Sequence, residues 1–241
     1  MNLLDLTLPT PAENLACDEA LLDWCEEQEH GEILRFWESS VPFVVVGYAN
    51  KIETEVNIAA CQAKNIPIFR RCSGGGTVVQ GRGCLNYALI LRIIENSPTA
   101  GISGANRFIM ERNGEAIRSA LGSRRMVSIR GHTDLTNDGI KFSGNAQRRR
   151  KHYLLFHGTF LWNFDLGLIS EFLQMPSQQP DYRKDRKHED FVSNLSATAD
   201  EIKAAMRTIW RAKKALKDPP LEKILALASE KYASPEWNFK F

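Results

Sequence analysis

The sequence of 241 residues predicts a mixed α/β (α+β) fold built around one or two sheets. Three observations support this prediction. Segments with helical spacing alternate with short β-branched runs in the first part of the chain. Strand-like runs joined by polar turns cluster in the middle, and amphipathic helical segments close the chain. This order is typical of sheets flanked by helices.

The first part of the chain is expected to form a helix, a short strand, a second helix, a second short strand and a long strand. The first helix has Asn14 as its expected N-cap. Pro42 and Gly47 bound the first strand, which is rich in valine and therefore typical of a buried strand. The final run of this part is apolar enough for a central strand. In order, the expected elements are helix 11–28, strand 41–48, helix 53–65, strand 66–71 and strand 85–94.

The second part begins with an amphipathic helix and continues into strands. The Asn-Asp-Gly turn at 137–139 is a strong hairpin signal. A polar, aperiodic stretch then predicts an exposed loop. The expected elements are helix 106–122, strands within 128–164, a short helix 166–175, the loop 176–194, and helices 198–216 and 219–233.

Composition narrows the class of protein. The chain has 43% hydrophobic and 25% charged residues, which is typical of a globular protein, and the length suits one domain spanning 1–241. The net charge of +2 gives no argument for a nucleic-acid or acidic-membrane partner. No apolar run is long enough for a membrane span, and no signal peptide is evident. Five cysteines without a CxxC pair favour the reducing cytoplasm.

Residues 70–86 read RRCSGGGTVVQGRGCLN and combine charge with backbone freedom. Three consecutive glycines allow close approach to backbone amides, and Arg70 and Arg71 add donors suited to carboxylate or phosphate. The segment therefore predicts a cradle for an anion. It is neither a Walker A loop nor a Rossmann fingerprint, because it lacks the lysine and is followed by a strand. A glycine-rich hairpin with two solvated arginines remains the alternative.

A second block surrounds Lys141, which lies just after a turn and could meet a phosphate or a developing oxyanion. An ordinary exposed strand lysine is the alternative. His157 lies in an apolar strand, where a histidine is typically a hydrogen-bonded core residue, and the sequence identifies no partner acid for it. The basic run 148–151 is interpreted as a solvated turn. Cys72 and Cys84 are interpreted as small buried residues.

The two blocks together resemble a known family. RRCSGGGTVV resembles the RRxSGGGAV signature of the lipoate–protein ligase A family. GIKFSGNAQ followed by LLFHGTFL resembles its second block, GxKxSGxA then HGTLL. Two weaker sequence similarities lie nearer the N-terminus, in the same order as in the family. The resemblance covers roughly residues 14–240. It implies largely antiparallel sheets flanked by helices, the catalytic-domain fold shared with biotin ligases. The chain ends where larger ligases continue into a C-terminal accessory domain, so a single catalytic domain is expected.

The resemblance also implies an activity. The family activates lipoate with Mg-ATP (ATP and Mg2+) to lipoyl-AMP and transfers the lipoyl group to a lysine of a lipoyl-domain acceptor protein. Octanoate is an alternative substrate, and a separate accessory protein is a possible further partner. Lys141 is the implied catalytic residue; no metal ligand is implied. The implied binding residues are Arg71, Ser73, Gly74, Gly75, Gly76, Thr77, Val78, Val79, Lys141, Ser143, Gly144, Ala146, His157, Gly158 and Thr159.

Two alternatives remain open. One is an ATP-independent octanoyl or lipoyl transferase that uses a cysteine thioester; here all cysteines lie at or before Cys84, which favours the ligase, while Cys72 and Cys84 keep the transferase open. The other is a non-catalytic binder of lipoate or adenylate. It is supported by Gln80-Gly81, which stand where the family usually has His-Asp.

Overall fold

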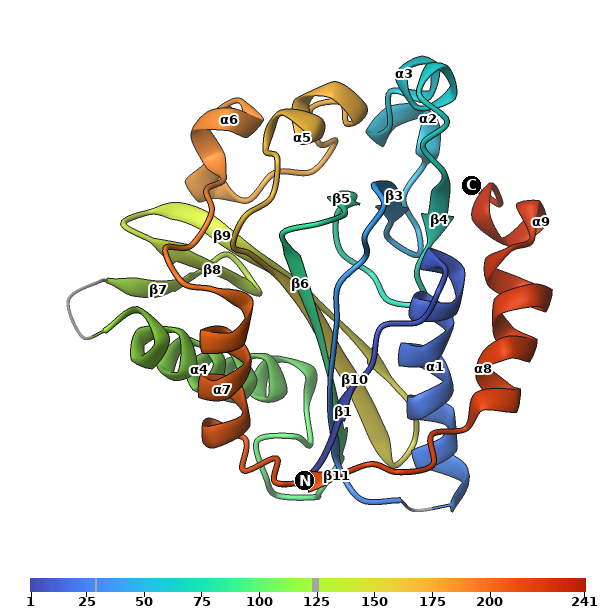
Figure 1. Ribbon diagram of the computed structural model, residues 1–241. Coiled ribbons are helices and arrows are strands. Elements are labelled where there is room, and N and C mark those ends of the chain that lie inside the picture. The colour runs from blue at the N-terminus through green and yellow to red at the C-terminus, as the bar shows by residue number, and fades with distance from the viewer. Residues whose placement is uncertain (29, 123–125) are drawn as a thin grey trace.

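The computed structural model describes residues 1–28, 30–122 and 126–241. A main sheet of eight strands has the order β11–β1–β2–β6–β10–β9–β8–β7, and a smaller sheet has the order β4–β3–β5 (Figure 1). From β2 to β7 all neighbouring strands of the main sheet are antiparallel. The strands are β1 (Asn2–Asp5), β2 (Ile33–Trp37), β3 (Phe43–Val46), β4 (Ile68–Arg70), β5 (Val78–Gln80), β6 (Cys84–Arg92), β7 (Val127–Arg130), β8 (Asp134–Asn137), β9 (Ile140–Arg149), β10 (Tyr153–Leu161) and β11 (Lys214–Ala215).

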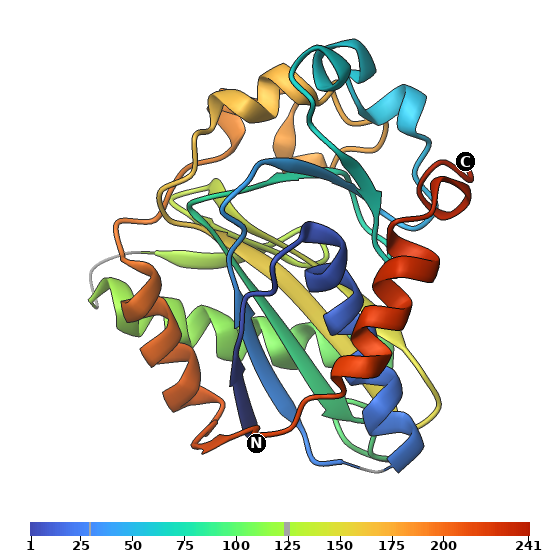
Figure 2. The same cartoon turned by 45° about the vertical axis from the view of Figure 1, so that its right-hand side comes forward.

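Helices cover both faces of the main sheet. α4 and α7 pack together on one face, and α1 and α8 pack together on the other (Figures 1 and 2). The shorter helices lie at the end of the molecule that carries the small sheet. The helices are α1 (Pro11–Gln28), α2 (Ile52–Glu55), α3 (Ile58–Ala63), α4 (Ile102–Leu121), α5 (Gly167–Phe172), α6 (His188–Phe191), α7 (Ala199–Ile209), α8 (Leu221–Leu227) and α9 (Pro235–Asn238), with η1 (Asp181–Arg183) and the π-turn η2 (Ala228–Tyr232).

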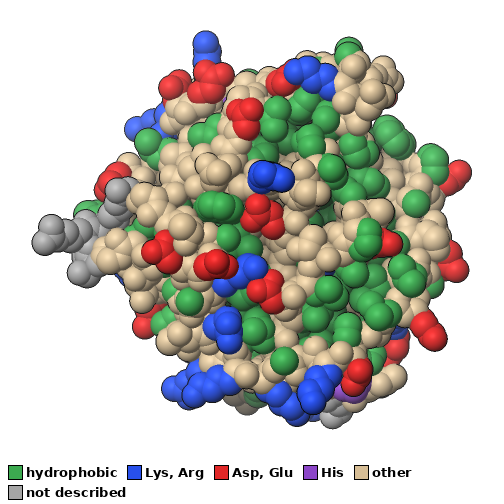
Figure 3. Space-filling view, in the orientation of Figure 1, with side chains coloured by type: hydrophobic (Ala, Val, Ile, Leu, Met, Phe, Trp, Pro, Cys, Tyr) green, Lys and Arg blue, Asp and Glu red, His purple; other side chains and the backbone are tan. Residues whose placement is uncertain are grey.

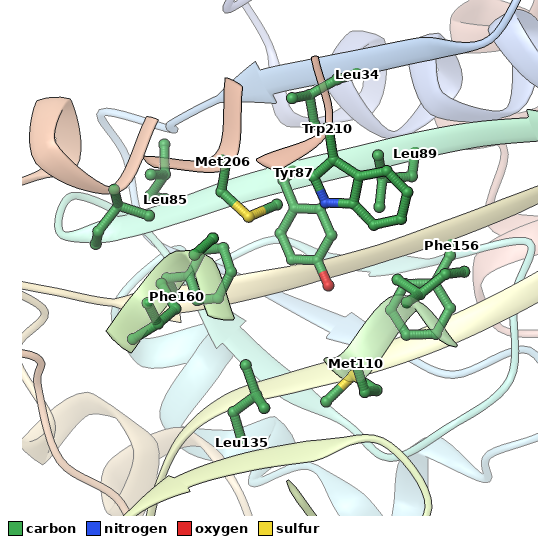
Figure 4. Close-up of a cluster of buried hydrophobic side chains, with 14 of the residues drawn as sticks. Leu34, Leu85, Tyr87, Leu89, Met110, Leu135, Phe156, Phe160, Met206 and Trp210 are labelled. Carbon is green, nitrogen blue, oxygen red and sulfur yellow. The ribbon is translucent and has the colours of Figure 1, made fainter. Parts of the chain in front are cut away.

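Strand β6 lies in the middle of the main sheet because its side chains are apolar on both faces. Tyr87 and Leu89 belong to the cluster that includes Met110 of α4 and Met206 of α7 (Figure 4). Ala88 and Ile90 point the other way and join the cluster formed with α1. The two-residue alternation of a strand thus supplies both cores at once. The prediction of a central strand at 85–94 is confirmed.

The small sheet has its own core, in which valines of β3 pack with α2, α3 and α5. β3 pairs in parallel with β4 and antiparallel with β5. The glycine segment connects β4 to β5, so it crosses from one edge of this sheet to the other. Its position is therefore set by two short strands that hold its ends.

The predicted fold class is confirmed, and the hairpin at Asn-Asp-Gly joins β8 to β9, with Asp138 (φ 50°) and Gly139 (φ 81°) at positive φ. Asn14 as N-cap is wrong. The Thr10 hydroxyl accepts from the Glu13 amide, and the Glu13 carboxylate accepts from the Thr10 amide. This capping box starts the helix earlier, since it satisfies both amides reciprocally.

Two predicted helices differ in extent. Residues 53–65 form the separate helices α2 and α3, because Val56 between them is extended and bridges to Leu173. The helix expected over 198–216 ends at Ile209, where the chain turns through Arg211 at positive φ toward β11. No helix within the described ranges is long and apolar enough to cross a membrane. Figure 3 shows acidic and basic side chains interspersed over one face, with hydrophobic side chains gathered in its right half.

Candidate functional site

The two sequence blocks meet in space. β9 and β10 carry the second block and pair side by side, with Gly144 opposite Thr159 and Ala146 opposite His157. The glycine loop (residues 71–77) lies against them. A Cβ atom on Gly75 would be 3.6 Å from the Ala146 Cβ, and Ser73 Oγ is 2.6 Å from His157 Nε2. Residues far apart in sequence thus form one site, which we call the loop–strand site.

Arg71 holds the glycine loop in its observed shape. Its Nε and Nη2 donate to the Gly74 carbonyl at 3.0 and 2.6 Å, and Nη2 also donates to the Gly76 carbonyl at 2.7 Å. Burial lowers the pKa of Arg71 to about 10. This value is still well above neutral pH, and the side chain therefore stays cationic. The intervening glycines are exposed. Their amides can therefore be reached by an anion beside a fixed positive charge.

Two glycines are required by the geometry of this loop. Gly75 has a φ of +85°, a backbone angle that residues with a side chain rarely adopt. Gly47, at the end of β3, lies directly beneath it, and a Cβ there would be 2.0 Å from the Gly75 carbonyl oxygen. The loop passes over β3 only because no side chain stands at that position.

Arg70 is not part of the cradle, and its prediction as an anion donor is wrong. It is fully buried. Its Nη1 donates to the carbonyls of Gly47, Tyr48 and Asn50, and its Nε donates to those of Trp237 and Asn238. Strand alternation sends Arg70 and Arg71 in opposite directions. Arg70 therefore fastens the C-terminal segment to the base of the glycine loop.

Lys141 lies over Gly144. A Cβ on Gly144 would be 3.0 Å from Lys141 Nζ, so the lysine occupies space that a side chain would fill. Nζ forms an ion pair with Asp134 Oδ1 at 2.8 Å, and the Lys141 side chain is 25% exposed. Lys141 is thus a paired, partly accessible cation and not a freely solvated strand lysine.

The segment 176–191 packs over this ion pair. Tyr182 donates its hydroxyl to Asp134 Oδ2 at 2.7 Å, and its ring packs on Phe191. Burial and the neighbouring charge of Asp134 raise the pKa of Tyr182, so its hydroxyl remains a donor. Lys141 Nζ lies 5.9 Å from the Phe191 ring centre. The segment predicted to be an exposed loop therefore contains η1 and α6 and contributes to the site.

His157 has the partner acid that the sequence did not identify. Its Nδ1 is 3.0 Å from Asp18 Oδ2, and Asp18 Oδ1 is 2.6 Å from Arg35 Nη1. Burial alone would raise the pKa of Asp18, but Arg35 and His157 lower it below its ordinary value. Asp18 is therefore ionised at neutral pH, in a region where both members of the ion pair are almost completely buried.

The remaining predicted binding residues surround this centre. Thr77 Oγ1 accepts from Asn50 Nδ2, and the Thr159 hydroxyl accepts from Gln80 and donates to Asn86. Gln80 thus occupies the position of the missing histidine as a buried hydrogen-bond partner. Val79 and Ser143 are buried, whereas Thr77, Val78, Gly144, Ala146, Gly158 and Thr159 are partly exposed. Their roles in ligand binding stay predictions.

Arg148 is a further candidate for this site that sequence reasoning did not name. It shares a face of β9 with Gly144 and Ala146 because residues two apart point the same way. Its guanidinium lies 5.9 Å from the Tyr48 ring, and its buried Nε has no hydrogen-bond partner among the described residues. The interpretation of the basic run as a solvated turn is also wrong for Arg149, which donates to Thr99 and Ala100 carbonyls. The alternation of a strand places residues 144, 146 and 148 on one face, and this pattern could have identified Arg148 from the sequence.

A hydrogen-bonded chain supports the site from behind. Asn145 exchanges hydrogen bonds with the backbone and side chain of Thr133 and accepts one from the Tyr87 hydroxyl. Tyr87 in turn accepts from Asn113, and Asn113 accepts from Trp210. These buried polar groups are thereby satisfied inside the largest apolar cluster, which fixes the strand between Lys141 and Ala146.

All five cysteines are buried and free. Burial, aided by the charge of Glu19, raises the pKa of Cys72 to about 12, and burial raises the pKa of Cys84 above its ordinary range. Neither thiol is a thiolate at neutral pH. The prediction of small buried residues is confirmed for both. Within the described residues no group of three or more His, Cys, Asp or Glu side chains could hold a metal ion.

The arrangement is suited to a reaction at an acyl or phosphoryl centre. The glycine loop with Arg71 lies against Ala146, and the Lys141 ammonium lies against Gly144, two residues earlier on β9. Fixed donors of this kind stabilise negative charge as it develops on an oxygen. The hydroxyl–imidazole–carboxylate series of Ser73, His157 and Asp18 adds a group that can accept a proton.

The chain is similar to known proteins. Residues 10–216 match the family model described as lipoyl protein ligase A/B catalytic domain. An octanoyltransferase LipM from Bacillus anthracis is 27% identical over 268 residues, which cover 96% of this chain and 95% of the relative. The corresponding protein of Geobacillus kaustophilus is 28% identical over 267 residues, with 95% and 94% covered.

Solved structures show the same fold. The bipartite lipoate protein ligase of Thermoplasma acidophilum has a TM-score of 0.78 and 22% identity, covering 99% of this chain and 95% of that chain. A lipoate-protein ligase A bound with ATP has a TM-score of 0.78 and 23% identity, covering 99% and 98%.

Proposed function

The chain belongs to the lipoyl protein ligase A/B catalytic-domain family, and we propose that it transfers an octanoyl or lipoyl group to a lysine of a lipoyl-domain acceptor protein. The position of Lys141 carries this proposal. Its ammonium lies over Gly144, where only a hydrogen occupies the side-chain position, and faces the strand against which the glycine loop packs. An acyl carbonyl placed beside this ammonium would receive a hydrogen bond that strengthens as the oxygen becomes negative.

The acyl donor of the proposed reaction is already activated. We propose an octanoyl thioester of a carrier protein, because the full-length relatives at 25–28% identity are named octanoyltransferases. The acceptor amine forms the new C–N bond, the C–S bond breaks, and the carrier thiolate leaves with the electron pair and takes up the proton that the nitrogen loses. This route consumes no ATP.

A thioester on this enzyme itself would place special demands on Cys72 or Cys84. The attacking form of a cysteine is the thiolate, and both thiols are buried with raised pKa values. Either residue would have to move out of its core position to accept an acyl group. We therefore propose direct transfer to the acceptor lysine.

ATP-dependent ligation is the second candidate, and the burial of every thiol favours it. Arg71 and the exposed glycines would hold the phosphates of ATP, and Mg2+ would offset their charge. In this route lipoate or octanoate attacks the α-phosphorus, pyrophosphate leaves, and the amine then displaces AMP from the acyl carbon. Since the archaeal structural neighbour is described as bipartite, a separate accessory polypeptide is part of this candidate. The five free thiols favour the cytoplasm in either case.

One assay separates the candidates. The chain is mixed with a lipoyl-domain acceptor and either octanoyl-carrier protein without ATP or octanoate with Mg-ATP, and acceptor mass and pyrophosphate are measured. Acylation from the carrier alone supports the transferase; acylation that requires ATP supports the ligase. Lys141→Ala should abolish the reaction, whereas Lys151→Ala, at an exposed hairpin turn, should not. Binding without acylation under both conditions would indicate a non-catalytic binder.

A further inference from the structure

Ser73, His157 and Asp18 form an unbroken hydrogen-bonded series that the proposed function has not used. Ser73 lies in the glycine loop, His157 lies on β10, and Asp18 lies on α1. The contacts are 2.6 Å from Ser73 Oγ to His157 Nε2 and 3.0 Å from His157 Nδ1 to Asp18 Oδ2. Three elements that are distant in sequence therefore align a hydroxyl, an imidazole and a carboxylate.

The charge on Asp18 fixes the direction of one of these hydrogen bonds. An ionised carboxylate only accepts, so Nδ1 of His157 carries a proton and donates to Asp18. The relay requires the form in which Nε2 carries no proton and accepts from the Ser73 hydroxyl. This alignment directs the basic nitrogen of His157 toward Ser73 and leaves the Ser73 oxygen with free lone pairs.

The surroundings of His157 preserve this arrangement. Arg35 of β2 pairs with Asp18 on the side away from the ring. The register partners of His157 on the neighbouring strands are Ala88 of β6 and Ala146 of β9, and neither carries a charge. Among the described contacts of His157, Asp18 is thus the charged partner that holds its orientation.

Amide formation needs a proton acceptor. A lysine amine is ordinarily protonated at neutral pH, with a pKa of about 10.4, and the nitrogen must lose protons before the amide is complete. Asp134 is poorly placed for this task, since both of its oxygens are engaged by Lys141 and Tyr182. Ser73, in contrast, is in the same loop as Gly75, which lies against Ala146 beside Gly144. Ser73 is itself buried, so movement of the glycine loop, whose next residues 74–76 are exposed, would have to uncover its hydroxyl.

We propose that Ser73, His157 and Asp18 are a proton relay that deprotonates the incoming acceptor lysine, an inference that rests on the proposed acyl transfer. The lysine ammonium first gives a proton to the Ser73 oxygen while the Ser73 proton passes to His157 Nε2, and the neutral amine that results then bonds to the acyl carbon. Asp18 stabilises the resulting imidazolium. The leaving thiolate or AMP departs with the electron pair of the broken bond. The second proton of the nitrogen passes to the leaving group or to solvent, and the imidazolium returns its proton to solvent.

The test compares two acceptors. Wild type, Ser73→Ala and His157→Gln are supplied with the octanoyl donor that wild type uses, and with either a lipoyl domain or hydroxylamine as acceptor. Hydroxylamine is uncharged at neutral pH and needs no prior deprotonation. His157→Gln should lower the rate with the lipoyl domain about 100-fold and should lose the acidic limb of the pH–rate profile. With hydroxylamine the same variant should retain a rate within about threefold of wild type.

His152→Gln is the matched control, because His152 is an exposed histidine at the β9–β10 turn. It should keep both rates and the full pH profile. If His157→Gln slowed both acceptors equally, or left both unchanged, the relay would be overturned and His157 would be structural or idle. If wild type acylated neither acceptor, the proposed acyl transfer itself would fail, so the two failures are distinguishable.

Discussion

Two aspartates with cationic partners flank the glycine loop, and they differ in exposure. Asp18 and Arg35 have side chains that are 3% and 0% exposed, whereas those of Asp134 and Lys141 are 14% and 25% exposed. Removing one member of a buried pair leaves an uncompensated charge, but an exposed pair can exchange its partner for water or ligand at little cost. The first pair therefore fixes the scaffold, and the second is free to act on a substrate.

The largest expected effect is on stability at the buried pair. Asp18→Ala should lower the free energy of unfolding by about 3–5 kcal/mol, because Arg35 remains buried without its carboxylate. Asp134→Ala should lower it by about 1–2 kcal/mol, because the partly exposed ion pair with Lys141 and the hydrogen bond from Tyr182 are both lost. Urea unfolding of both variants measures the difference. Equal losses would show that the two pairs do not differ in the way their exposure indicates.

The next effect is on activity at the exposed pair. Lys141→Ala should reduce acyl transfer on the order of 100-fold or more, since a donor to the developing oxyanion is lost. The midpoint of its urea unfolding should stay close to that of wild type. Rates are measured with the donor that wild type uses. Full activity in this variant would contradict the placement of the reaction at Lys141.

A smaller effect should appear in the pH dependence of stability. The pKa of Asp18 is lowered in the folded state, so its contribution is present above the unfolded pKa of about 3.9 and is lost as pH falls through the folded value. Wild type should therefore lose stability with increasing slope below about pH 4. Asp18→Asn should show a shallower slope over the same range in urea titrations. An identical slope in the two proteins would mean that folding does not lower the pKa of Asp18.

The same comparison shows what the sequence could and could not predict. Local patterns predicted β6 and the Asn-Asp-Gly hairpin, because periodicity and turn residues report on neighbours along the chain. The family resemblance, and not a local pattern, implied that the glycine loop and the Lys141 block share one site. The partners of the two aspartates are different in kind. His157 is 139 residues from Asp18, and Tyr182 is 48 residues from Asp134. Such pairs are made by tertiary packing, which no local pattern encodes.

Arg70 and Arg71 make this limit concrete. They are identical, adjacent side chains, and composition assigned both to an anion cradle. One instead donates to five carbonyls that include the C-terminal segment, while the other holds the glycine loop. The two side chains differ only in direction. Arg70 ends β4 and Arg71 starts the following loop, so they point to opposite sides.

The smallest expected effect sharpens the role of the exposed pair. Tyr182→Phe removes the hydroxyl that donates to Asp134 Oδ2 but keeps the ring on Phe191. The free energy of unfolding should fall by about 1 kcal/mol, the usual net value of one hydrogen bond. With Asp134 held less firmly, Lys141 should exchange more readily between Asp134 and substrate, so KM should change by a few fold while kcat changes less. Steady-state kinetics at several acceptor concentrations measure both. A large fall in kcat with unchanged KM would instead mean that the Tyr182 hydroxyl acts in the chemical step, and that the exposed pair is as rigid as the buried one.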